Sequence, residues 1–138
     1  MLIKDQQGAF FASGGDDENA LTGALAQCIA HSERLLRMVL RNVGLKNVRA
    51  PNLQSARVFY QRHVEDRKEG ITDIEIEIPG ILHVIIEAKI KAAFTDIEQC
   101  QKYLGRFSPT ISRKRLAVLV DAADIGIIDE YRSRNPSF

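Results

Sequence analysis

The stretch Ile71-Thr-Asp-Ile-Glu-Ile-Glu-Ile78 alternates between acidic side chains and isoleucines from Asp73 onward. A period of two predicts a β-strand, because successive side chains of a strand point to opposite faces of its sheet. One face of this strand is therefore apolar, and the other carries Asp73, Glu75 and Glu77. Such alternation is typical of a sheet with one buried face and one polar face.

A second strand is predicted over residues 82–90, after the turn Pro79-Gly80, and it is more continuously apolar. It ends as Ile85-Ile-Glu-Ala-Lys-Ile90, so Glu87 and Lys89 stand two residues apart and project from the same face. Charged side chains on a rigid apolar strand cost free energy unless something compensates them. A metal ion or an anionic substrate would supply that compensation.

The rest of the chain predicts elements in the order helix, three strands, helix, strand. The predicted helices cover residues 16–43 and 95–107, and the predicted strands cover residues 57–64, 71–78, 82–90 and 115–120. Short connections make the first three strands antiparallel, and the second helix provides the crossover that a parallel fourth strand requires. We therefore expect an α/β fold with an αβββαβ core, in which helices flank a mixed four-stranded sheet.

Length and composition suit a single globular domain. The chain has 138 residues, of which 45% are hydrophobic and 27% are charged. We expect a flexible N-terminal segment over residues 1–15 and one domain over residues 16–138. The net charge of +1 means that any phosphate-binding surface must come from local arrangement.

Several sequence features favour a cytoplasmic location. No apolar run approaches the roughly 20 residues of a membrane span, and the N-terminus lacks the pattern of a secretory signal. Cys28 and Cys100 lack the spacing of a zinc site, so we interpret them as two buried, reduced thiols.

The order of elements and the placement of these charges resemble the PD-(D/E)XK nuclease superfamily. In that family an acid lies near the start of the second strand and Glu-x-Lys lies on the third. Asp73 and Glu87-Ala-Lys89 match these two positions, and Thr72 stands where the family's name has proline. The resemblance covers residues 16–122 and implies a restriction-endonuclease-like core.

Residues on the two helices extend the resemblance. Glu18 is similar to the family's N-terminal helical glutamate, and Gln99 and Tyr103 resemble its Gln-x-x-x-Tyr element. Residues four apart lie on one helical face, so Gln99 and Tyr103 can point at one site. Glu18 would contribute to the metal site, and the other two would contact a phosphate oxygen or support the ligands. An exposed polar pair is the alternative interpretation of Gln99 and Tyr103.

The resemblance implies a Mg²⁺-dependent or Mn²⁺-dependent phosphodiesterase, either an endonuclease or an exonuclease. Asp73 and Glu87 would bind the metal, with the backbone carbonyl of Ala88 as a further ligand. The metal would lower the pKa of a bound water. Lys89 would orient that water or stabilise the transition state.

Other interpretations of the charged residues stay open. Asp73, Glu75 and Glu77 could form a solvated sheet face with no site. Glu75 could also replace Asp73 or add a third ligand. The run Arg113-Lys-Arg115 is either solvated or, near the edge of the site, steers phosphate.

The implied partner is nucleic acid, with DNA favoured over RNA and with no membrane. No sequence-reading module is recognisable, so specificity would come from a homodimer mate or a larger complex. A role in restriction or phage defence is an analogy. The alternative function is a catalytically inactive nuclease-fold protein that binds nucleic acid or assembles a complex.

Overall fold

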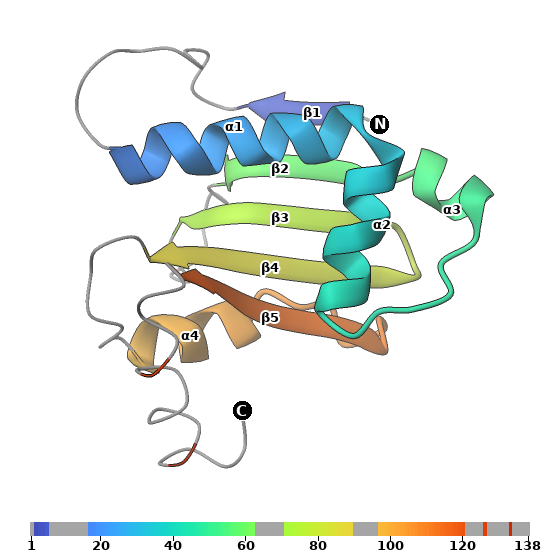
Figure 1. Cartoon of the computed structure of the whole chain (residues 1–138). Helices are drawn as coiled ribbons and strands as arrows, with labels where there is room; N and C mark the ends of the chain where they lie inside the picture. Colours follow the sequence, from blue (N-terminus) through green and yellow to red (C-terminus); the bar gives the residue numbers. More distant parts are fainter. Residues whose placement is uncertain are drawn as a thin grey trace.

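The computed structural model describes residues 2–5, 17–62, 71–89 and 97–120, together with Gly126 and Ser133 (Figure 1). Side chains are described over residues 19–62, 71–88 and 101–120, and also at the two single residues. In chain order the elements are β1 (Leu2–Asp5), α1 (Asp17–His31), α2 (Glu33–Asn42), α3 (Ala50–Gln54), β2 (Arg57–Arg62), β3 (Thr72–Ile78), β4 (Leu82–Lys89), α4 (Ile97–Leu104) and β5 (Arg113–Val120).

The sheet is mixed, and its strands lie in the order β1-β2-β3-β4-β5. Strands β2, β3 and β4 form an antiparallel meander, and β5 pairs with β4 in parallel after the α4 crossover. The predicted meander and crossover over these four strands are confirmed. Strand β1 pairs in parallel with β2 at the edge of the sheet. Residues 2–5 of the segment 1–15 thus form a strand that the sequence did not predict.

The predicted long helix over residues 16–43 is wrong in one respect, because the chain breaks it at Ser32. This residue has an extended backbone (φ −132°, ψ 104°), and its hydroxyl accepts a hydrogen bond from the Leu35 backbone N–H at 3.2 Å. A serine in this position caps a new helix, which begins at Glu33. The end near Gly44 is confirmed, since Gly44 follows the cap residue Val43 with φ +80°.

Helices α1 and α2 cover one face of the sheet (Figure 1). The core lies between them and the apolar side of β3 and β4, where the even-numbered residues of both strands are buried. Its fully buried members include Ile29, Leu36, Leu40, Val58, Ile74, Ile76, Ile78, Leu82 and Val84. Cys28 is exposed, so the expectation that both cysteines are buried is wrong for this residue. The side chain of Cys100 lies outside the described residues.

The opposite face of the sheet carries the odd-numbered residues of β3 and β4. Tyr103 of α4 and Arg106 of the following turn are buried against it. The helix predicted over residues 95–107 is observed as Ile97–Leu104. Residues 63–64, 90 and 95–96, which belong to the predicted strands and helix, lie outside the described residues.

None of the helices that the structure describes is both long and apolar enough to cross a membrane.

Candidate functional site

The carboxylate of Asp73 reaches across from β3 to the backbone of β4. The pairing of these strands extends as far as Ile74 and Ile86, and continuing that register by one residue places Asp73 opposite Glu87. Here the Asp73 Oδ2 atom accepts a hydrogen bond of 2.7 Å from the Ala88 backbone N–H. That N–H belongs to the peptide joining Glu87 to Ala88, so the Asp73 carboxylate lies beside the backbone of Glu87.

Glu87 is only 3% exposed, and its neighbour on the other side is Val118 of β5. Lys89 is the last residue of β4 and pairs with Val120, which places its backbone at the same end of the sheet. Its side chain lies outside the described residues. The three predicted catalytic residues therefore share one end of two adjacent strands.

The first turn of α1 lies at this same end of the sheet. The Asn19 backbone carbonyl accepts a hydrogen bond from the Tyr60 hydroxyl at 2.9 Å, and the Asn19 Oδ1 atom accepts one from Gln61 Nε2 at 2.8 Å. Tyr60 pairs with Ile74, the residue after Asp73. The backbone of Glu18 is therefore close to the start of β3, although its side chain lies outside the described residues.

Tyr103 supports the site through the backbone. Its side chain is fully buried, and its hydroxyl donates to the Ile71 carbonyl at 2.7 Å. Ile71 precedes β3, two residues before Asp73. The alternative interpretation as an exposed polar residue is therefore wrong for Tyr103, whose hydroxyl binds the backbone that leads into β3. The side chain of Gln99, one turn earlier on α4, lies outside the described residues.

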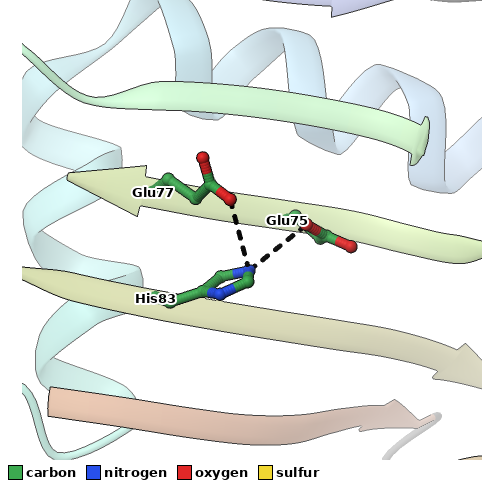
Figure 2. A group of neighbouring side chains, drawn as sticks. All are labelled: Glu75, Glu77 and His83. Carbon is green, nitrogen blue, oxygen red and sulfur yellow. Dashed lines mark hydrogen bonds and ion pairs between the residues drawn. The ribbon is translucent and has the colours of Figure 1, made fainter. Parts of the chain in front are cut away.

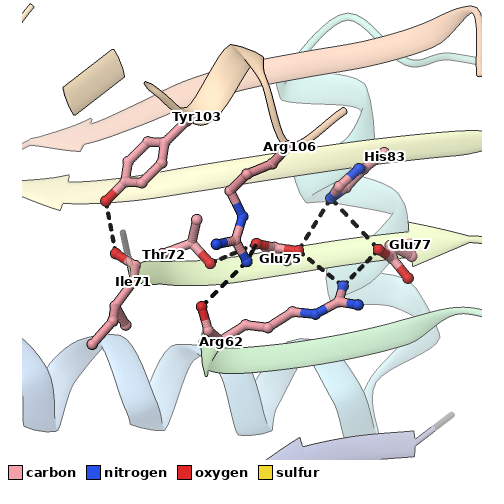
Figure 3. A network of polar contacts seen from close by, with 8 residues as sticks. All are labelled: Arg62, Ile71, Thr72, Glu75, Glu77, His83, Tyr103 and Arg106. Atoms are coloured by element: carbon pink, nitrogen blue, oxygen red, sulfur yellow. Dashed lines mark hydrogen bonds and ion pairs between the residues drawn. The ribbon is translucent and has the colours of Figure 1, made fainter. Parts of the chain in front are cut away.

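A second polar cluster surrounds Glu75, and the sequence analysis did not predict it (Figure 3). The four donors to the Glu75 carboxylate come from four different parts of the chain. They are Thr72 at 2.7 Å, Arg62 at 2.9 Å, His83 at 3.2 Å and Arg106. Because a carboxylate only accepts hydrogen bonds, His83 Nε2 must carry the proton that it donates.

Arg62 belongs to this cluster because the backbone at Gln61 reverses the alternation of β2. Gln61 has φ +44°, and both Tyr60 and Gln61 point toward Asn19 on the α1 side. The next side chain, Arg62, consequently emerges on the opposite face. It binds Glu77 at 2.6 Å as well as Glu75, and its guanidinium lies 3.9 Å from the centre of the Phe59 ring.

The charge of Glu75 is held inside the sheet by its donors. Burial opposes ionisation and raises the pKa of this carboxyl group. The hydrogen bonds from His83 and Thr72 and the positive charges of Arg106 and Arg62 act more strongly in the other direction. Together they lower the pKa of Glu75 from 4.5 to about 2, so the group is ionised at neutral pH.

Glu75, Glu77 and His83 could hold a metal ion, because one ligand atom of each lies within 4.8 Å of the others (Figure 2). Binding would require His83 Nε2 to lose its proton, since a metal takes the nitrogen lone pair. It would also require Arg62 to leave the two carboxylates, whose charges the arginines already balance. The geometry therefore fits an ion-pair network held by buried hydrogen bonds, and it identifies no particular metal.

The run Arg113-Lys-Arg115 lies far from the predicted site. Arg113 pairs with Leu82 at the start of β4, whereas Lys89 at the other end pairs with Val120. The expectation that this run borders the site is therefore wrong. The parallel direction of β5 decides the matter, because it places the start of β5 beside the start of β4.

Comparisons with protein-family models, with curated proteins and with solved structures gave no match to this chain.

Proposed function

We propose that this protein is a metal-dependent nuclease with a restriction-endonuclease-like core. One observation carries the proposal: the Asp73 carboxylate is hydrogen-bonded to the peptide that follows Glu87, one residue before Lys89. Two acids and the backbone of a lysine thus lie at one end of the sheet. Such a set of residues suits phosphodiester hydrolysis, because the scissile phosphate is already shielded by negative oxygens.

The donor set suits a hard divalent cation. Carboxylates of Asp73 and Glu87 and the carbonyl of Ala88 are oxygen ligands of the kind that Mg²⁺ and Mn²⁺ prefer. When bound, such a metal would act as a Lewis acid and would lower the pKa of a water. The part of Lys89 would be to place a compact positive charge where negative charge develops on phosphate oxygens.

The neighbouring Glu75 cluster is the weaker candidate for the metal. Arg62 and Arg106 neutralise its acids, so a divalent cation would meet two fixed positive charges there. We therefore assign the metal to Asp73 and Glu87, and we assign a structural role to the Glu75 cluster.

The proposed substrate is DNA, and the proposed location is the cytoplasm. The test is cleavage of plasmid and single-stranded DNA by the purified chain with Mg²⁺, with Mn²⁺ and with EDTA. Lys89→Ala should reduce the metal-dependent rate by about 10²–10³, the usual loss when one transition-state donor is removed. Labelled RNA in the same assay would show whether DNA is the preferred substrate.

Two further variants separate the charge of the site from its fold. Asp73→Asn keeps an oxygen that can accept from the Ala88 N–H, and Glu87→Gln keeps the shape of the side chain. Both should abolish metal-dependent cleavage with little change in the thermal unfolding temperature. Glu33→Gln, an exposed glutamate paired with Arg37, is the matched control and should cleave like the parent. Equal cleavage by the parent and all three site variants would contradict the proposal.

A further inference from the structure

Basic residues are segregated from acidic ones along this nearly neutral chain. Residues 34–62 contain no aspartate or glutamate but have seven basic residues: Arg34, Arg37, Arg41, Lys46, Arg49, Arg57 and Arg62. Residues 99–120 also lack acids and have five basic residues: Lys102, Arg106, Arg113, Lys114 and Arg115. Local positive charge of this size attracts polyanions even when the net charge is only +1.

The fold brings parts of these two segments together at one end of the sheet. The loop that follows α2 accepts hydrogen bonds from three arginines, one on α2 and two on β5. The pairs are Arg37 to the Val48 carbonyl at 3.1 Å, Arg113 to the Lys46 carbonyl at 2.7 Å and Arg115 to the Val43 carbonyl at 3.1 Å. Backbone carbonyls fix the position of a guanidinium group but leave its full positive charge.

Among the described residues, most cations at this end are not neutralised by an acidic side chain. Arg37 is the exception, because Glu33 pairs with it at 2.8 Å. Over the part of the chain that the structure describes, no acidic side chain forms an ion pair with Arg41, Lys46, Arg113 or Arg115. We call these four residues the basic end of the molecule.

An open pocket of about 320 Å³ lies at this end, and its lining includes Arg37, Arg41, Lys46 and Asn47. Arg41 and Lys46 are exposed. The pocket therefore places two exposed cations beside Arg37, whose guanidinium is held by the Val48 carbonyl and by Glu33. An exposed planar guanidinium such as that of Arg41 can bind phosphate oxygens with two parallel hydrogen bonds.

We propose that the basic end binds the phosphodiester backbone of a nucleic acid, at a surface separate from the Asp73–Glu87 site. The two lie at opposite ends of β4. Residues 82 and 88 of that strand are separated by about 20 Å at about 3.3 Å per residue. Three of the four residues of the basic end are arginines, which favours nucleic acid over a lipid surface, where flexible lysines and inserted apolar side chains dominate. The inference shares its partner class with the proposed nuclease but does not depend on catalysis.

The test measures binding of a short labelled DNA duplex to the full chain in EDTA, so that no metal-dependent step contributes. The double variant Arg41→Gln/Lys46→Gln should bind more weakly. Its plot of log affinity against log salt, between about 50 and 200 mM NaCl, should be less steep by about 2, since each lost phosphate contact removes about 0.9. Among the residues that the structure describes, neither side chain forms a hydrogen bond, so the fold should be unaffected.

The matched comparison is Lys46→Gln against Lys102→Gln, an exposed lysine on α4. Both lower the net charge by one, and only Lys46→Gln should reduce the salt slope. Equal slopes for these two variants would overturn the inference, as would unchanged binding by the double variant. Binding to phosphatidylserine vesicles that requires Arg41 and Lys46, without binding to DNA, would also overturn it. The salt slope is measured in EDTA and cleavage is measured with Mg²⁺, so a failure of the nuclease proposal and a failure of this inference remain distinguishable.

Discussion

At the scale of single residues, Glu75 shows how a charge can be stable inside a sheet. The side chain is 1% exposed, and an unpaired carboxylate there would cost several kcal/mol. Donors from β2, β3, β4 and the turn after α4 compensate this cost (Figure 3). The His83 ring is itself held edge-on against Phe107, with centroids 4.9 Å apart. Removing any one donor would leave a buried charge with less compensation.

This network predicts how stability depends on pH. The pKa of Glu75 in the folded protein, about 2, lies below its ordinary value of 4.5. Its charged form therefore stabilises the fold above pH 4.5, and this contribution is lost as the pH falls toward 2, at about 1.4 kcal/mol per pKa unit.

Urea unfolding of the parent and of Glu75→Gln at several pH values between 3 and 7 tests this, as the range spans most of the titration. The parent should lose stability as the pH falls, and the variant should be less stable at pH 7 but lose less on acidification. Glu33→Gln, which changes an exposed acid, should follow the parent. Parallel curves for the parent and Glu75→Gln would show that this carboxylate does not carry the dependence.

At the scale of elements, the break between α1 and α2 sets how the helices cover the sheet. Ser32 ends the helical path and begins a second helix, whose Leu36 and Leu40 are buried in the core. Glu33 in the first turn and Arg41 in the last turn complement the helix dipole. Local signals thus start and end α2, and its apolar side fixes how it packs.

The cap of α2 gives a stability prediction. Ser32→Ala removes the hydroxyl that accepts from the Leu35 N–H and should destabilise the protein by about 1 kcal/mol. Ser32→Asp retains an acceptor and should stay within a few tenths of the parent. Chemical denaturation measures both values. If the alanine and aspartate variants were equally stable, the hydroxyl would not be acting as a cap.

At the scale of the whole molecule, the mixed sheet keeps one acidic pair and the basic end apart. Asp73 and Glu87 lie at one end of β3 and β4, and Lys46 and Arg113 lie at the other. The α4 crossover ties the acidic end together, because Tyr103 holds the residue before β3. An antiparallel fourth strand would instead have placed Arg113 beside Lys89.

The tie through Tyr103 can be tested by removing one oxygen atom. Tyr103→Phe should cost about 1 kcal/mol of stability, the usual net value of one hydrogen bond. It should also slow the proposed metal-dependent cleavage, since the start of β3 carries Asp73. Tyr60→Phe, which loses a similar bond to the Asn19 carbonyl, calibrates the stability cost in the same denaturation experiment. Parental stability in Tyr103→Phe would mean that the bond to Ile71 contributes nothing.

Much of the fold could be predicted because its signals are local. Period-two alternation located β3, continuous apolar character located β4, and the spacing of the remaining elements gave the crossover. The same alternation put Asp73 on the charged face with Glu87. It could also have revealed His83, which lies four residues before Glu87 and on the same face as Glu75. Ser32 followed by Glu33 was a local signal of the helix break that the continuing apolar pattern obscured.

The remaining features depend on contacts between distant parts of the chain. Strand β1 pairs with the edge of β2 that β3 leaves open. Arg62 faces Glu75 because Gln61 adopts a positive φ, and a glutamine gives no sequence signal for that conformation. The sequence by itself determined β2 to β5 and the strands that carry Asp73, Glu87 and Lys89, because side-chain periodicity is a property of each strand alone. Only the tertiary structure decided which charges neutralise one another. Register, strand direction and the α4 crossover set those distances, and none of them is encoded in a single segment.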